Sequence, residues 1–287
     1  MRKLITGSVI FAAVVAFSLA GMVAQGRQSG QGQAGANNTG RSGNPLPVRK
    51  FDTLGNDPGG PAPKKSITGA WAGPQEPKIA KAPSLTPLGQ KMFAMHHTEA
   101  KYSAAGTNDP WYNTCDPMGF PRSSINEIRA IMFSETPDRI VETYQYSRLW
   151  RDIMTDGRPL PKDVGKPNGQ DPRWYGYSVG HWEGDNTFVV DTTGSDERSW
   201  LDKEGDPHSV NAVVHETYER TSHNLMTNNI TITDPTVYTA PFPITTVLYK
   251  WIPDQQFEEQ ICVPSEMIAY RSLIGNPAGD GGVQAHK

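Results

Sequence analysis

From residue 126 to residue 263, apolar and polar side chains alternate with a period of two, and turn-forming residues interrupt the alternation at short intervals. This pattern is typical of antiparallel β-strands, because successive side chains of a strand point to opposite faces of the sheet. A sheet of consecutive strands removes its unpaired edges by closing on itself. The sequence therefore predicts a mainly β protein, an antiparallel meander in a closed or partly closed β-barrel, with a β-sandwich as the alternative. The predicted strands are 126–134, 139–146, 149–155, 174–182, 187–192, 211–221, 224–233, 244–252 and 257–263.

One short helix is predicted ahead of these strands, from Thr86 to about Lys101. Thr86 can accept a hydrogen bond from the first turn, Pro87 occupies a position that needs no amide donor, and apolar residues recur on one face. The 28 glycines and 24 prolines of the chain argue against a helical bundle or a coiled coil.

The N-terminal residues predict export. Arg2 and Lys3 precede an uncharged, apolar run that ends at Ala20, and small residues follow, as in a secretory signal peptide. We assign residues 1–24 to this signal, and the alternative is a retained membrane anchor. After cleavage the protein would be periplasmic or extracellular, without stable membrane insertion.

Composition divides the rest of the chain into three parts. Residues 25–66 are rich in Gly, Gln, Asn, Pro and Ser. Such a segment buries too little apolar surface to offset the entropy of ordering it, so we expect a disordered linker. The same reasoning predicts a disordered tail at 274–287. Residues 67–273 remain as a single β-rich domain, which is long enough for one core.

Charge and cysteine content exclude several classes of protein. The 27 basic residues nearly balance the 30 acidic ones, for a formal charge of −3, which excludes an electrostatic nucleic-acid binder. Two cysteines, Cys115 and Cys262, cannot build a cysteine-based zinc cluster or an iron–sulfur site. In an exported protein they are expected to form a disulfide that joins the two ends of the domain, with two buried thiols as the alternative.

Several motifs carry a family resemblance. The segments CDPMGFPR at 115–122, TDGRPLP at 155–161 and YGYSVGHWEGD at 175–185 are similar to motifs of a family of exported bacterial hypothetical proteins. That family has no settled activity, so the resemblance implies relatedness and export but no particular reaction. The segment SITGAW at 66–71 is also similar to the Gly-x-Trp opening of lipocalin-like barrels, which implies a lipocalin-like fold.

The two longest connections between predicted strands carry the candidate catalytic residues. If neighbouring strands pair, the connections at 156–173 and 194–209 leave the sheet near the same rim and could form the mouth of a pocket. His208 would then lie near Asp156 or Asp191, and a histidine with a carboxylate is the minimum for general base catalysis near neutral pH. The alternative is that His208 braces its loop. No close spacing of metal ligands occurs, so we expect neither a metal site nor a cofactor.

A second set of candidates combines aromatic rings with carboxylates. Two Glu-x-Tyr pairs place a glutamate and a tyrosine on the same strand face. A carboxylate at a core-facing position needs a buried partner or a wet cavity, and Arg151 or Arg158 could supply the partner. The alternative is ordinary core aromatics with the glutamates facing solvent. The predicted ligand-binding residues are Glu142, Tyr144, Arg158, Tyr177, Trp200, Glu216 and Tyr218.

The predicted function is therefore small-ligand binding, in a barrel that encloses an apolar or amphipathic molecule between aromatic walls. Two alternatives remain: an acid–base enzyme of the isomerase, dehydratase or hydrolase type, and a structural or carbohydrate-binding envelope protein. A hollow, polar-lined interior would favour the first two functions, and a solid core would favour the third. The sequence leaves the ligand and the oligomeric state open.

Overall fold

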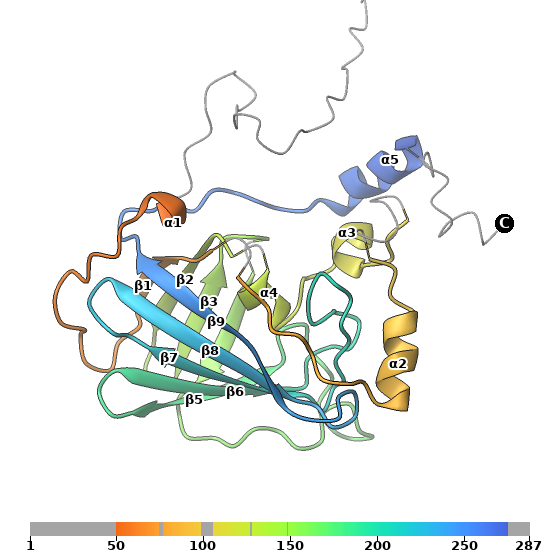
Figure 1. Ribbon diagram of the computed structural model, residues 1–287, viewed down its shortest axis with the longest axis horizontal. Helices are drawn as coiled ribbons and strands as arrows, with labels where there is room; N and C mark the ends of the chain where they lie inside the picture. The colour runs from red at the N-terminus through yellow and green to blue at the C-terminus, as the bar shows by residue number, and fades with distance from the viewer. Residues whose placement is uncertain (1–49, 75–76, 99–105, 127, 148, 275–287) are drawn as a thin grey trace, which may run out of the picture. The chain divides into compact units, whose positions relative to one another are not determined.

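The barrel wall consists of strands that pair in sequence order, and the first strand closes the ring against the last (Figure 1). The computed structural model describes residues 50–74, 77–98, 106–126, 128–147 and 149–274. In this part of the chain the strands are β1 (Gly69–Ala72), β2 (Ala130–Glu135), β3 (Arg139–Tyr144), β4 (Trp150–Met154), β5 (Tyr177–Glu183), β6 (Thr187–Thr193), β7 (Val213–Glu219), β8 (Leu225–Thr233) and β9 (Phe242–Trp251). The prediction of a mainly β, closed meander is confirmed.

One pair of neighbouring strands departs from the antiparallel meander. β4 and β5 run parallel, and their register contains only the pairs Ile153 with Ser178 and Met154 with Val179. Parallel neighbours cannot be joined by a tight turn, so residues 155–176 must carry the chain back along the barrel. This β4–β5 seam is consequently a short junction in the wall, and a long connection lies beside it.

The predicted strands agree with the structure except at the two ends of the barrel. All predicted segments but the last correspond to β2 through β9. The last prediction, 257–263, is wrong: this segment forms only an isolated bridge, between Gln260 and Tyr146. β1 was not predicted, because four residues of sequence GAWA show no alternation of apolar and polar side chains. Gly69 adopts φ +126° there, and a β-carbon at this position would lie 2.0 Å from the Trp251 ring.

The core occupies the inside of the barrel. Buried residues alternate with more exposed ones along β3, β7 and β8, so one face of each strand points inward. The inward side chains form one hydrophobic cluster, which includes Trp71, Phe133, Phe188 and Tyr249. This packing, together with a buried group of charged side chains described below, fills the interior.

The helices are short: α1 (Lys50–Thr53), α2 (Pro87–Ala94), α3 (Pro110–Thr114), α4 (Arg122–Ile125) and α5 (Pro264–Ile274). All four residues of α4 are buried, and Ile125 belongs to the hydrophobic cluster, so α4 packs against the core. The predicted N-cap of α2 is confirmed, since the Thr86 hydroxyl oxygen accepts a hydrogen bond from Gly89 N at 3.1 Å. The helix ends at Ala94, earlier than the predicted Lys101.

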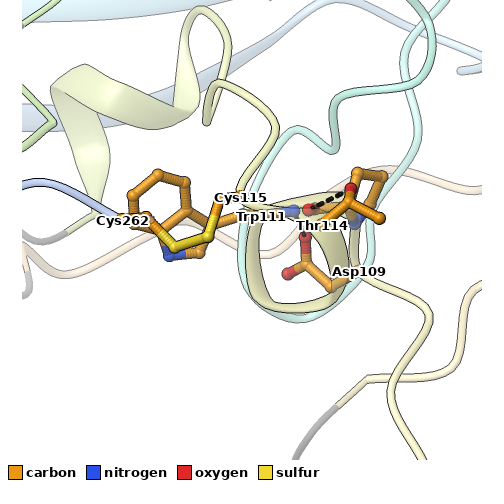
Figure 2. Close-up of a disulfide and its surroundings, with 6 residues drawn as sticks. Asp109, Trp111, Thr114, Cys115 and Cys262 are labelled. Atoms are coloured by element: carbon orange, nitrogen blue, oxygen red, sulfur yellow. Dashed lines mark hydrogen bonds between the residues drawn. A yellow bond between two sulfur atoms is a disulfide. The ribbon is translucent and has the colours of Figure 1, made fainter. Parts of the chain in front are cut away.

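A disulfide between Cys115 and Cys262 confirms the predicted cysteine pairing (Figure 2). Cys115 directly follows α3, whose first turn is capped by the Asp109 carboxylate at 3.1 Å from Trp111 N. Cys262 precedes α5, so the bond joins the segment before β2 to the segment after β9. A disulfide of this kind indicates an oxidising compartment.

The predicted signal, residues 275–287 of the predicted tail and most of the predicted linker lie outside the described residues. Residues 50–66 of that linker are described, and they contact the barrel. The Lys250 ammonium donates a hydrogen bond to the Leu54 carbonyl at 2.8 Å, and Arg220 donates to the Ser66 carbonyl at 3.0 Å. Among the described residues, no helix has the length and apolar character needed to cross a membrane.

Candidate functional site

A group of three charged side chains lies inside the barrel. Nη2 of Arg151, on β4, is 2.8 Å from a carboxylate oxygen of Glu142 on β3 and 2.8 Å from one of Glu216 on β7. The side chain of Arg151 is 2% exposed, and both glutamates are 0% exposed. Because each isolated buried charge would be costly, the three residues stabilise one another across the interior. We call them the interior charge cluster.

Polar and aromatic neighbours surround this cluster. Tyr218 donates a hydrogen bond to Glu216 at 2.8 Å, and the Asn228 amide donates to the same oxygen at 3.0 Å. The Arg151 guanidinium lies over the Phe120 ring, 4.0 Å from its centroid. The two ion pairs with Arg151 have short distances but lack aligned hydrogen bonds, so they offset only part of the cost of burial.

The environment shifts the proton affinity of the cluster. Burial raises the pKa of Glu142 from its usual 4.5 to about 7, although the positive charge of Arg151 opposes this shift and the negative charge of Glu216 adds to it. Burial also holds the pKa values of Tyr144 and Tyr218 well above their usual range. One carboxyl group inside the barrel therefore exchanges a proton near neutral pH.

The interior charge cluster shows which way the glutamates of the two Glu-x-Tyr pairs point and which arginine is their partner. Both glutamates point inward, and Arg151 rather than Arg158 is their partner. Tyr144 and Tyr218 lie inside as well, with the Tyr144 hydroxyl 3.3 Å from that of Ser124. The contributions of Asn228 and Phe120 were not predicted, because nothing in their local sequence marks them as neighbours of a charge.

A large open groove lies over the β4–β5 seam, with a volume of about 1170 Å³. Its lining comes from β4, from β5, from the connection between them and from Arg139 of β3, and it includes Trp150, Arg151, Arg158, Arg173 and Tyr177. Trp150 is 61% exposed although tryptophan is the largest apolar side chain. We call this site the seam groove. It contains two predicted ligand-binding residues, Arg158 and Tyr177, and Arg151 links it to the interior cluster.

The walls of the seam groove are held by specific contacts. The Tyr177 hydroxyl donates to the Asp171 carbonyl at 2.8 Å, and the Arg173 guanidinium lies 4.2 Å from the centre of the Tyr177 ring. Arg173 also forms a bridge with Ser195 of the next long connection. The two long connections named in the sequence analysis therefore do lie side by side.

His208 lies in the second of these connections but is fully enclosed. Its Nε2 is 3.0 Å from the Ser199 hydroxyl and its Nδ1 is 3.4 Å from the Ser209 carbonyl. Burial lowers the pKa of this imidazole, which favours the neutral ring. These contacts resemble those of a side chain that braces its loop.

The two carboxylates predicted to assist His208 have other partners. Asp156 accepts hydrogen bonds from Arg158, the shortest at 2.6 Å, and Asp191 lies 2.8 Å from Nδ1 of His215. Neither carboxylate is therefore a hydrogen-bond partner of His208 in the structure, and a catalytic role for these three residues stays a prediction.

The remaining predicted ligand-binding residue, Trp200, lies away from both sites. It is buried and stacks on the His96 ring, with centroids 4.5 Å apart. The guanidinium of Arg122, itself paired with Asp109 at 2.7 Å, lies 5.9 Å from the Trp200 ring. This arrangement packs the segments outside the barrel. Within the described residues, no cluster of three or more histidine, cysteine or acidic side chains could hold a metal ion.

Comparison with known proteins adds no family to this description. A scan against protein families finds no match to the chain, and a search of curated proteins finds no similar sequence. The closed barrel is compatible with the lipocalin-like resemblance of residues 66–71, and the family itself stays an expectation.

Proposed function

We propose that this protein binds a small saccharide in the seam groove, on the outside of the barrel. The observation that carries this proposal is the exposed indole of Trp150 inside a groove of about 1170 Å³. An apolar ring of that size left in solvent beside polar side chains is a frequent mark of a binding surface. The proposal keeps the predicted ligand binding but moves the ligand from the interior to the outer wall.

The packed interior supports this change of place. Bulky buried side chains fill the barrel, and the interior charge cluster joins β3, β4 and β7 across it. A ligand inside would have to displace residues that form the core. The interior therefore acts as a rigid support for the outer wall, on which a binding site keeps its geometry.

The lining of the groove favours a saccharide over an apolar molecule. Polar and apolar side chains contribute together: Trp150 offers an exposed ring, and Asp152, Gln170 and Arg173 offer hydrogen-bonding groups. A sugar ring has C–H groups on its faces and hydroxyls around its rim, so it matches such a mixture. An apolar ligand gains most from an enclosed pocket, which this open groove does not provide.

Export fits the same proposal. The Cys115–Cys262 bond indicates an oxidising compartment, and residues 1–24 have the pattern of a secretory signal. We therefore propose that the protein meets its ligand in the periplasm or outside the cell. N-terminal sequencing of protein recovered from that compartment should begin near residue 25. A chain that still begins at residue 1 would favour the retained anchor.

Binding can be tested by calorimetry with unreduced protein and defined probes: cellotriose, maltotriose, chitotriose and decanoate. We expect at least one trisaccharide to bind, and Trp150→Ala to weaken that binding about tenfold or more, as truncation of a central aromatic contact does. Phe93→Ala is the matched control, because Phe93 is an exposed aromatic residue on α2, outside the seam groove.

Two results would contradict the proposal. If Trp150→Ala and Phe93→Ala bind the trisaccharide as the wild type does, the seam groove is not the site. If decanoate binds and no trisaccharide does, the protein takes an amphipathic ligand, as the sequence analysis predicted.

A further inference from the structure

We propose that the saccharide bound in the seam groove is acidic, and that Arg173 holds its single oxyanion group. This inference rests on the proposed function, and it names the class of ligand and the residue that selects it.

Four arginines line the seam groove, and Arg173 differs from the other three. Arg139 and Arg158 each contact a neighbouring aspartate, at 2.8 and 2.6 Å, and Arg151 contacts the two buried glutamates. In the part of the chain that the structure describes, the Arg173 guanidinium contacts the Tyr177 ring and no carboxylate. Arg173 is thus the groove arginine whose N–H groups are available to a ligand.

The position of Arg173 is fixed by its backbone and by its side chain. Its amide donates to the Gly194 carbonyl at 3.0 Å, and its carbonyl accepts from the Asp196 amide at 2.9 Å. Its guanidinium carbon lies over the Tyr177 ring, and the Tyr177 hydroxyl is itself bonded to the Asp171 carbonyl. The N–H groups of a guanidinium can pair with the two oxygens of a carboxylate.

The acidic residues of the groove limit the charge of the ligand. Asp152 and Asp171 also line it, and Asp152 lies 3.6 Å from Arg139. These carboxylates would repel a ligand with many negative charges, and this repulsion would offset the attraction of the ligand to Arg173. A saccharide with one acidic unit, which stacks its other units against Trp150, avoids this repulsion.

The test uses calorimetry on the unreduced protein with three matched disaccharides. They are a glucuronate-terminated disaccharide, its methyl ester, and the same disaccharide terminated by glucose 6-sulfate. We expect the acid to bind about tenfold or more tightly than the ester, since hydrogen bonds to a charged group are the stronger ones. Arg173→Gln should bring the ratio of the two affinities close to one.

Two further variants sharpen the result. Arg158→Gln should keep the preference for the acid, because Arg158 already holds Asp156. Arg173→Lys should retain only part of the preference, because an ammonium cannot form the paired hydrogen bonds of a guanidinium. If the sulfated disaccharide binds best and Arg173→Gln removes that preference, the oxyanion is a sulfate and Arg173 keeps its role.

The possible failures can be told apart. If acid and ester bind equally to the wild type, and Trp150→Ala weakens both, the proposed function stands and the role of Arg173 is refuted. If trigalacturonate binds more tightly than the singly charged acid, the restriction to one charge is wrong. If no saccharide binds at all, both proposals fail.

Discussion

The pKa of Glu142 gives a quantitative test of the interior charge cluster. Burial raises this pKa from its usual 4.5 to about 7. Between these two values the folded protein holds a proton that the unfolded chain has released, so the free energy of unfolding falls as the pH rises. The stabilisation is complete below pH 4.5 and is lost as the pH passes 7. The difference corresponds to about 3 kcal/mol.

Glu142→Gln should remove this pH dependence. Glutamine has nearly the shape of a protonated glutamate, so we expect the variant and the wild type to have similar stability at pH 5. At pH 8 the variant should be the more stable by up to about 3 kcal/mol, because it has no carboxyl group to ionise in the core. Urea unfolding followed by tryptophan fluorescence between pH 4.5 and 8.5 measures the difference directly.

A matched control separates this effect from a general loss of charge. Glu219→Gln removes an exposed carboxylate at the end of β7 and should leave the pH profile as it is. If the wild type and Glu142→Gln lose stability in parallel from pH 5 to pH 8, Glu142 is already ionised in the folded protein. The explanation based on desolvation would then be wrong.

Further predictions concern residues outside the interior cluster. Burial and the neighbouring Asp202 raise the pKa of Asp206 to about 7, so Asp206→Asn should also flatten the loss of stability between pH 5 and 8; an unchanged urea profile would contradict this. Reduction of the Cys115–Cys262 bond should lower the free energy of unfolding by at most about 5 kcal/mol, and equal urea midpoints with and without reductant would refute a stabilising role. His208→Asn should lower the free energy of unfolding by about 1–3 kcal/mol, because it disturbs a buried hydrogen bond to Ser199. Unchanged stability, together with lost turnover of a screened substrate, would instead indicate that His208 is catalytic.

The alternation of side chains predicted most of the wall correctly because it is a local signal. Each of β2 to β9 has one face in the core, so its own sequence records which side chains are buried. The segment 257–263 has a similar alternation, but its only backbone pairing is the isolated bridge between Gln260 and Tyr146. The segment is therefore not a strand of the sheet. Conversely, β1 is a strand because β2 and β9 pair with it on both sides.

The candidate site was predicted only in part, for a related reason. Because a core-facing glutamate needs a buried partner, Arg151 and Arg158 were both candidates for Glu142 and Glu216, and the structure shows that Arg151 is the partner. The seam groove was not predicted, because the alternation of apolar and polar side chains does not show that β4 and β5 run parallel. Of its lining, only Arg158 and Tyr177 were predicted to bind a ligand, and nothing in the sequence indicated that Trp150 would be exposed.

By itself, the sequence predicted a mainly β structure from local periodicity, a disulfide between Cys115 and Cys262 from the expected export, and a buried partner for any core-facing Glu142 or Glu216 from the cost of burial. The tertiary structure alone decided how the ring closes, which neighbours run parallel, and where His208, Asp156 and Asp191 find their partners. Those outcomes depend on contacts between residues far apart in the chain, and the order of side chains along one strand carries no record of them.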